Sequence, residues 1–239
     1  MRNYFIFISS LLVACSSSLI LQAQQLVPFQ VNQKVGYKDA NGREVIKAQY
    51  DAGSAFEDGF AIVVFNQRRG FINSQGEEVI PLKYEDVKPF KEGVASVKLN
   101  GKYGFINKKG DLVIQPLFEE AGSFCEQRAR VLKNGKWGYI NHLGELAIPC
   151  IYANAMDFSQ GLACVKENEL YGFIGTEGQI LIPFQYSMAM PFNSNGEARV
   201  ATKNAGYQTF LINIQGKILR EEAIFDEHEK EMKEKNLKK

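Results

Sequence analysis

The sequence has few of the residues that carry most enzyme and metal chemistry. Its 239 residues include two histidines, His142 and His228, and a single tryptophan, Trp137. Two histidines far apart in sequence leave little material for histidine-based catalysis or zinc binding. The formal net charge is only +1, so the chain lacks the basic surface of a nucleic-acid-binding protein. We therefore expect no catalytic residue, no cofactor, no metal ligand and no nucleic-acid partner.

The N-terminus carries an apolar run, residues 4–14, which follows one positive charge and is interrupted by serines at 16–18. This pattern predicts an export signal rather than a transmembrane anchor. Two processing routes stay open. Cleavage after Ala23 would leave Gln24 as the first residue of a secreted or periplasmic chain. Alternatively, the four residues ending at Cys15 resemble a bacterial lipobox, in which Cys15 is lipidated and the product is an outer-membrane lipoprotein.

Three further cysteines, Cys125, Cys150 and Cys164, would remain after export. Their spacings of 25 and 14 residues match no metal-binding pattern. Export permits a disulfide, but an odd number leaves at least one thiol unpaired within a monomer. We predict that the three side chains act as small buried apolar residues.

Glycine, by contrast, is abundant and periodic. Trp137 lies in the stretch NGKWGYINHLGELAIP, and the glycine that follows it recurs every 34 residues. This first glycine is Gly36, Gly70, Gly104, Gly138 and Gly172. A second glycine stands six residues later, at Gly42, Gly76, Gly110, Gly144 and Gly178. A phenylalanine keeps the same phase, at Phe56, Phe90, Phe124, Phe158 and Phe192. Repetition at this period predicts a tandem array of supersecondary units.

Each unit reads as three short strands. The stretch VASVKL alternates apolar and polar residues, and Asn100-Gly101 after it is a strong hairpin turn. A second turn around Gly110 leads into DLVIQP, and the connector LFEEAGSF follows. The unit is therefore predicted to be a three-stranded antiparallel meander. Because three short strands bury too little on their own, we expect the units to stack, with the connector phenylalanine as the plug between them.

The tryptophan has counterparts in the other copies. Val35, Arg69, Tyr103 and Tyr171 occupy the place of Trp137. A position that accepts such different side chains indicates amphipathic covering of a strand rather than a unique binding pocket.

These motifs resemble the bacterial WG-repeat family, whose unit reads approximately K-W-G-F-I-D-x-x-G-x-x-V-I-P. The resemblance covers about residues 26–225, although tryptophan itself appears in one copy only. It implies a repeat architecture without a shared enzymatic activity. It therefore supports a scaffold or binding role and leaves the ligand open.

The expected fold is all-β, with tandem 34-residue repeats. We favour a propeller-like closed ring over an open β-array, because the incomplete units at the two chain ends could complete one common sheet. The predicted organisation is a signal peptide at 1–23 (or a lipoprotein signal at 1–14), a repeat domain at 24–220 with five full copies, and a charged helical tail at 221–239.

Two alternatives for local chemistry are weaker. Asp39 and Asn41 give the first turn a faint likeness to a calcium loop, but turn formation explains them better. The acidic connectors YEDV and FEEA are expected to be solvated loops. The favoured function is an exported, non-enzymatic scaffold that binds a protein or a cell-envelope glycan, with membrane contact only if Cys15 is lipidated. The alternative is an envelope carbohydrate-active enzyme with carboxylates in a central cleft; an enzyme should gather its unusual polar residues on one rim.

Overall fold

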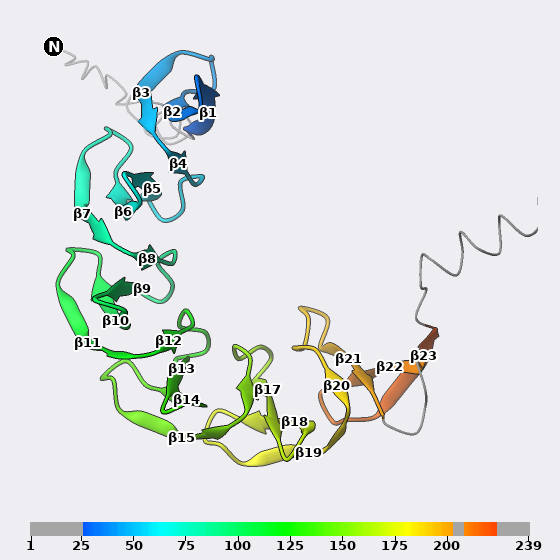
Figure 1. The fold of residues 1–239 in the computed structure, drawn as a ribbon. Coiled ribbons are helices and arrows are strands. Elements are labelled where there is room, and N and C mark those ends of the chain that lie inside the picture. The colour runs from blue at the N-terminus through cyan, green and yellow to red at the C-terminus, as the bar shows by residue number, and fades with distance from the viewer. Residues whose placement is uncertain (1–25, 203–207, 224–239) are drawn as a thin grey trace, which may run out of the picture. The chain divides into compact units, whose positions relative to one another are not determined.

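The computed structural model describes residues 26–202 and 208–223, and these residues form strands and turns without a helix (Figure 1). They belong to two compact units, Met1–Tyr84 and Glu85–Lys239, which are described separately. Within the described ranges, no helix is long and apolar enough to cross a membrane. The predicted signal with Cys15, Ala23 and Gln24 lies outside the described residues, as does most of the predicted helical tail.

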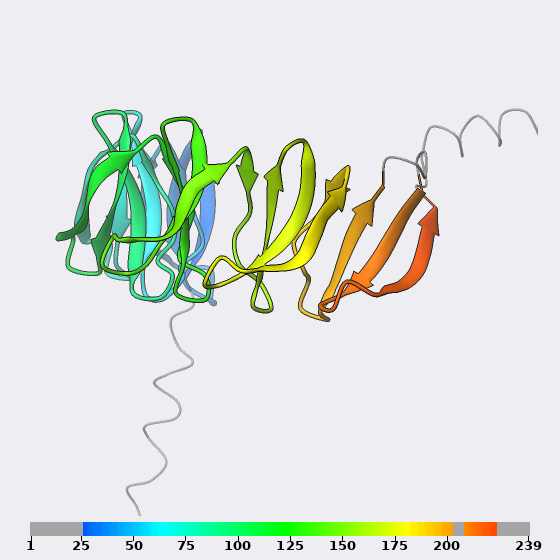
Figure 2. The same ribbon diagram turned by 90° about the horizontal axis from the view of Figure 1, so that it is seen from below.

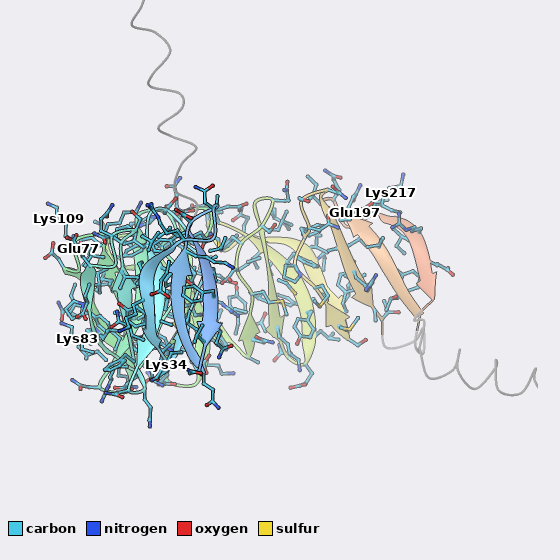
Figure 3. The ribbon with its side chains drawn as sticks, turned by 90° about the horizontal axis from the view of Figure 1, so that it is seen from above. Lys34, Glu77, Lys83, Lys109, Glu197 and Lys217 are labelled. Atoms are coloured by element: carbon cyan, nitrogen blue, oxygen red, sulfur yellow. The ribbon has the colours of Figure 1, made fainter. Side chains whose placement is uncertain are left out.

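The first unit contains two antiparallel sheets. Its first sheet has the order β1-β2-β3, from β1 (Val27–Val31), β2 (Lys34–Lys38) and β3 (Glu44–Tyr50). Its second sheet has the order β4-β5-β6-β7, from β4 (Ala52–Gly53), β5 (Ala61–Phe65), β6 (Arg68–Ile72) and β7 (Glu78–Tyr84). Figure 3 labels Glu77 and Lys83, which lie near the two ends of β7.

The second unit contains four antiparallel sheets, each of four strands in chain order. The first is β8 (Asp86–Val87), β9 (Val94–Leu99), β10 (Lys102–Asn107) and β11 (Leu112–Phe118). The next is β12 (Glu120–Ala121), β13 (Ala129–Lys133), β14 (Lys136–Ile140) and β15 (Leu146–Tyr152). Then follow β16 (Asn154–Ala155), β17 (Leu162–Glu167), β18 (Leu170–Gly175) and β19 (Ile180–Tyr186). The last is β20 (Met188–Ala189), β21 (Glu197–Ala201), β22 (Gln208–Asn213) and β23 (Ile218–Ala223) (Figure 2).

The prediction of three-stranded units is wrong by one strand for every described sheet after the first. The connector contributes a strand of two residues to the next sheet: Glu120 pairs with Leu132 and Ala121 with Val131. The chain leaves the outermost strand of one sheet at Phe118 and enters the following sheet two residues later. Because this strand is so short, no apolar alternation reveals it in the sequence.

The two glycines of each repeat have different roles. The second glycine occupies a turn and has a φ angle between +80° and +86° in all five copies, a region that favours glycine. The first glycine instead allows two strands to approach closely: a Cβ on Gly138 would lie 2.6 Å from the Ile148 carbonyl oxygen. A β-bulge lies at this point, since the register shifts between Trp137 and Tyr139 and again between Tyr139 and Ile140. The last sheet contains a sixth, incomplete copy of the repeat, in which Phe210 replaces the first glycine. The register there is unbroken from Gln208 to Leu211.

The hydrophobic core lies between successive sheets. In the second unit, one cluster joins Phe105 and Ile114 of one sheet to Ala129 and Val131 of the next. The connector phenylalanines pack into these interfaces against an aromatic ring of the preceding sheet, with centroid distances of 5.0 Å for Phe56–Tyr37, 5.1 Å for Phe124–Phe105, 4.8 Å for Phe158–Tyr139 and 4.9 Å for Phe192–Phe173. Phe90 is buried as well. Stacking of sheets therefore supplies the burial that a single sheet lacks.

The predicted completion of one sheet by both chain ends is wrong for the described residues. Every sheet is built from consecutive strands, the first from β1 to β3 and the last from β20 to β23. The last sheet already receives its fourth strand from its own connector, Met188–Ala189. At the C-terminal side, β23 continues to Ala223 and so includes the first three residues of the segment predicted as a tail.

Candidate functional site

Unusual polar residues gather around Trp137 in the second unit. Arg130 stands on β13 where neighbouring copies have Ile62, Ser96 and Cys164. Its Nε lies 2.9 Å from Asp157 Oδ1, and its Nη1 donates a hydrogen bond to the Ala155 carbonyl at 2.8 Å. Its guanidinium carbon also lies 5.2 Å from the Trp137 ring centroid, within reach of a cation–π interaction.

The absence of a side chain on Gly122 leaves room for this ion pair. A Cβ on Gly122 would lie 2.6 Å from Asp157 Oδ1 and 2.8 Å from Arg130 Cγ. The other copies have larger residues at this position: Ser54, Lys88, Met156 and Met190. The third copy therefore has both the arginine and the space that the arginine needs.

Lys88 extends the cluster to the preceding sheet. Its Nζ donates a 2.6 Å hydrogen bond to the Ala121 carbonyl. Burial lowers the pKa of Lys88, as does the charge of Arg130, while Asp157 and other carboxylates act in the opposite direction. The cluster contains both positive and negative side chains, so it does not form a surface of one charge. Its residues come from three successive sheets, which their contacts connect. Trp137 thus lies in an interface between sheets, covered by Arg130.

His142 takes part in a second group of contacts between sheets. Its Nε2 lies 3.0 Å from Glu92 Oε2, and its ring stacks on Phe124 with centroids 4.0 Å apart. Glu92 also accepts a hydrogen bond from the Gln127 backbone N–H at 3.0 Å. Among the described residues, no group of three or more His, Cys, Asp or Glu side chains has a geometry that could hold a metal ion.

The acidic connectors stay partly exposed, and some of their carboxylates also accept hydrogen bonds from the backbone. Glu119 accepts hydrogen bonds from the backbone N–H groups of Asn134 and Gly135, at 3.0 and 3.1 Å. Asp51 accepts one from Asn66 at 2.7 Å. These carboxylates therefore cap the hairpin turn of the sheet that they enter.

The first turn shows the same use of a carboxylate. Asp39 Oδ1 accepts hydrogen bonds from the backbone N–H groups of Asn41 and Arg43, at 3.0 and 2.9 Å. In the equivalent turns of other copies Asn107 and Asn141 accept hydrogen bonds in the same way. The Asp39 carboxylate is therefore engaged in turn formation, as in an Asx turn.

All three cysteines of the repeat domain carry free thiols. Cys164 is buried, and Cys125 and Cys150 are half-buried. Burial raises the pKa of each thiol, that of Cys164 to about 12. Since the thiolate is the reactive form, these side chains behave as apolar packing residues at neutral pH.

The outer strands of the second unit form the most unusual exposed surface. β11, β15 and β19 end their sheets along one side of this unit (Figure 1) and contain no charged residue. Their exposed apolar side chains, here called the outer surface, are Leu112, Val113, Leu117, Leu146, Ile151, Ile180 and Leu181. Leu117 is 62% exposed and Ile180 57%. The equivalent strands β3 and β7 of the first unit instead carry Glu44, Lys47, Glu78 and Lys83.

The outer surface does not follow from the sequence-based predictions, although the sequence contains a signal for it. The stretches LVIQPLF, LAIPCIY and ILIPFQY lack charge, whereas EVIKAQY and EVIPLKY at the same repeat positions are charged. An uncharged strand is also typical of a strand buried on both faces. The exposure of these strands follows from their position at the edge of each sheet, which the sequence alone does not give.

Known structures resemble this chain in fold. BamB from Moraxella catarrhalis aligns with a TM-score of 0.51 at 10% identity, over 84% of this chain and 71% of that one. Kluyveromyces lactis Hsv2p gives 0.52 at 9% identity, over 81% and 72%. Both are β-propellers, so the fold is propeller-like. The dihydro-heme d1 dehydrogenase NirN gives 0.52 at 10% identity, over 84% of this chain and 55% of that one.

No curated protein sequence matches the chain. The WG containing repeat, however, matches five successive segments, residues 36–68, 70–103, 103–137, 137–171 and 171–204. Each matched segment contains one copy of the two repeat glycines and one connector phenylalanine. The chain belongs to the WG containing repeat family.

Proposed function

We propose that the chain is an exported, non-enzymatic scaffold that binds another protein of the cell envelope through its outer surface. The exposure of seven large aliphatic side chains on three uncharged strands carries this proposal. Exposed apolar patches of this kind on water-soluble domains commonly mark contact sites for other proteins. A partner of this surface is expected to be apolar at the contact.

A protein is favoured over a glycan because the aromatic rings are already engaged. Glycan recognition would be expected at exposed aromatic faces, but Tyr103, Trp137 and Tyr171 lie half-buried. Cationic groups of Lys98, Arg130 and Lys166 lie 5.4, 5.2 and 5.7 Å from their respective ring centroids. The aliphatic side chains of the outer surface are more exposed than these aromatic residues.

The enzymatic alternative finds less support in the same cluster. Unusual polar residues do gather in one part of the second unit, as an enzyme would require. Their groups are, however, paired with one another: Asp157 lies against Arg130, and Lys88 donates to a backbone carbonyl. A pair of carboxylates facing a substrate-sized gap is the feature that glycosidase chemistry would need.

Photo-crosslinking in the native host tests the binding role. A benzophenone amino acid at Leu117 or Ile151 should yield discrete crosslinked protein bands, because these side chains are exposed on the outer surface. The same amino acid at Glu78 or Lys83, on a charged outer strand of the first unit, is the matched control. Equal crosslinking from all four sites, or none from Leu117 and Ile151, would overturn the proposal.

Export is tested by the intact mass of the mature protein beside a Cys15→Ser variant. An acylated Cys15 at the N-terminus means a membrane-tethered lipoprotein. An unmodified chain that begins at Gln24 means a secreted or periplasmic protein. A chain that retains Met1 and stays in the cytoplasm would contradict export by either route.

A further inference from the structure

Among the described residues, the first sheet has no counterpart of an element that each later sheet contains. A linking segment of seven residues, from the end of one outer strand to the plug phenylalanine, joins each sheet to the next. The five linking segments read YDAGSAF, YEDVKPF, FEEAGSF, YANAMDF and YSMAMPF. They share an aromatic first residue, a small or β-branched fourth residue and a final phenylalanine, and the first three have a carboxylate in second place.

The linking segment Tyr50–Phe56 shows how such a segment binds the sheet that follows it. The Asp51 backbone N–H donates to the Val64 carbonyl at 2.7 Å, and its carboxylate accepts from Asn66 N–H. The next two residues form β4, which pairs with the edge of β5. Tyr50 lies in the same apolar cluster as Leu82. In the second unit, the segment that begins at Phe118 makes equivalent contacts through Glu119 and β12.

The corresponding positions on the first sheet have no such segment within residues 26–202 and 208–223. β1 pairs with β2 on one edge, and no described strand pairs with its other edge. The β1–β2 hairpin has the same backbone form as the capped hairpin of the second sheet: Asn32 and Gln33 have φ angles of 48° and 62°, against 49° and 63° for Asn66 and Gln67.

A hollow lies between the β1–β2 hairpin and β3. It measures about 330 Å³ and is lined by Val31, Asn32, Lys34, Glu44, Lys47 and Ala48. Ala48 occupies the position that Leu82, Cys150 and Phe184 fill in later sheets, and Phe184 there lies 6.4 Å from the ring of Tyr152, an outer-strand aromatic. The small side chain leaves space for an aromatic ring. Lys47 and Glu44 are the charged residues of β3 that line the hollow, whereas Lys34, labelled at the hairpin in Figure 3, is paired with Asp51 of the following linking segment.

We propose that the first sheet is a docking site for an extended segment of another protein with the pattern aromatic–acidic–x–small. The aromatic side chain enters the hollow over Ala48, and the carboxylate accepts hydrogen bonds from the Asn32 and Gln33 backbone N–H groups near Lys47, which lines the same hollow. The following residues add a short strand to β1, as in recognition by β-strand addition. Each part of this arrangement repeats a contact that the chain makes internally, so the proposal extends an existing interface.

The sequence favours a separate protein as the donor. In the repeat register, the residues before the first sheet read SSSLILQ at 16–22, which contains no aromatic and no acidic residue. The residues after the last sheet read IFDEHEK at 224–230, where Phe-Asp is followed by Glu and His rather than by a small residue. Neither end of the chain carries the pattern.

A synthetic peptide taken from the chain itself provides the test. Fluorophore-labelled FEEAGSF is titrated into the purified mature protein, and binding is followed by fluorescence anisotropy. Saturable binding is expected, with shifts of the Asn32 and Gln33 amide resonances. Ala48→Phe fills the hollow with the residue found at the same position of the fifth copy, and should weaken binding at least tenfold. The charge-reversed peptide FKKAGSF should lose affinity to a similar extent.

Two controls separate this proposal from the proposed function. Leu117→Ala alters the outer surface and should leave peptide binding unchanged. Lys47→Glu, which keeps the size of the hollow nearly constant, should weaken binding severalfold and replaces Ala48→Phe if that variant does not fold. The proposal is wrong if FEEAGSF shows no saturable binding, as it would if the chain's own residues occupy the edge. It is also wrong if the peptide binds the hollow variants as tightly as the wild type.

Discussion

At the scale of single residues, the first repeat position requires glycine because a larger side chain would not fit there, and not because of turn geometry. A Cβ on Gly138 would meet the backbone of Ile148, Pro149 and Cys150 at 2.6 to 2.7 Å, and a backbone cannot yield as a flexible side chain can. We expect Gly138→Ala to lower the free energy of unfolding by about 2 kcal/mol. Urea denaturation measures this, with Lys136→Ala on the same strand as an exposed control. Equal stability of the two variants would show that the bulge tolerates a methyl group.

Trp137 gives a direct probe of the Arg130–Asp157 pair, because it is the chain's single tryptophan. Gly122→Ala places a methyl group where these two side chains now lie. We expect it to displace the guanidinium from the indole ring and to change the fluorescence emission of Trp137. Arg130→Met should change the emission in the same sense, since it removes the cation. Wild-type emission from both variants would contradict this account of the cluster.

Tyr37 makes the stability of the first unit sensitive to alkaline pH. Burial, with a smaller contribution from Tyr50, raises the pKa of Tyr37 from 10.0 to about 12. The folded chain therefore keeps a proton that the unfolded chain loses between these values. The contribution of Tyr37 is fully present below pH 10 and is lost as pH rises towards 12. Tyr37→Phe should reduce the decline in unfolding free energy between pH 10 and 12, measured by urea titration at each pH.

Phenylalanine suits this position because Phe105 and Phe173 occupy it in other copies. The variant loses one hydrogen bond, from the Tyr37 hydroxyl to the Ser54 carbonyl at 2.9 Å, which should lower stability at all pH values alike. A decline as steep as that of the wild type would assign the alkaline sensitivity to other tyrosines.

At the scale of elements, the connectors determine how one sheet meets the next. Glu119 accepts two backbone hydrogen bonds from the hairpin that it faces, whereas its neighbour Glu120 is exposed. We expect Glu119→Ala to lower the unfolding free energy by about 1 kcal/mol, the usual value of such contacts. Glu120→Ala should be neutral. Thermal unfolding of the pair checks this, and equal effects would mean that the capping contact contributes nothing.

The sequence predicted regular elements better than connectors. Turn glycines and the Asn100-Gly101 hairpin follow from backbone chemistry, which is local and repeats in each copy. The two-residue strands, such as Glu120–Ala121, were missed because they depend on the edge of a distant strand and not on their own residues. The environment of Arg130 was missed for a related reason: its partners Ala155 and Asp157 belong to the next repeat, and Gly122 matters through the side chain that it lacks.

At the scale of the whole molecule, the family follows from the five matched repeats and the propeller-like fold from similar solved structures, while ring closure stays a prediction. The expected route to closure, one sheet shared by both chain ends, is replaced by sheets of consecutive strands.

A repeat array should also confine damage to the interface where it occurs, because each sheet is stabilised by its neighbours in sequence. Phe158 fills one interface of the second unit, with its ring 4.8 Å from that of Tyr139. Phe158→Ala should cost about 3 kcal/mol or more locally. Hydrogen exchange should then accelerate in β14 to β19, while β1 to β3 keep wild-type protection. Leu117→Ala, at an exposed position, is the control. Acceleration spread evenly over both units would mean that the described sheets unfold as one cooperative body, and that stacking between neighbours is not the level at which this fold is stabilised.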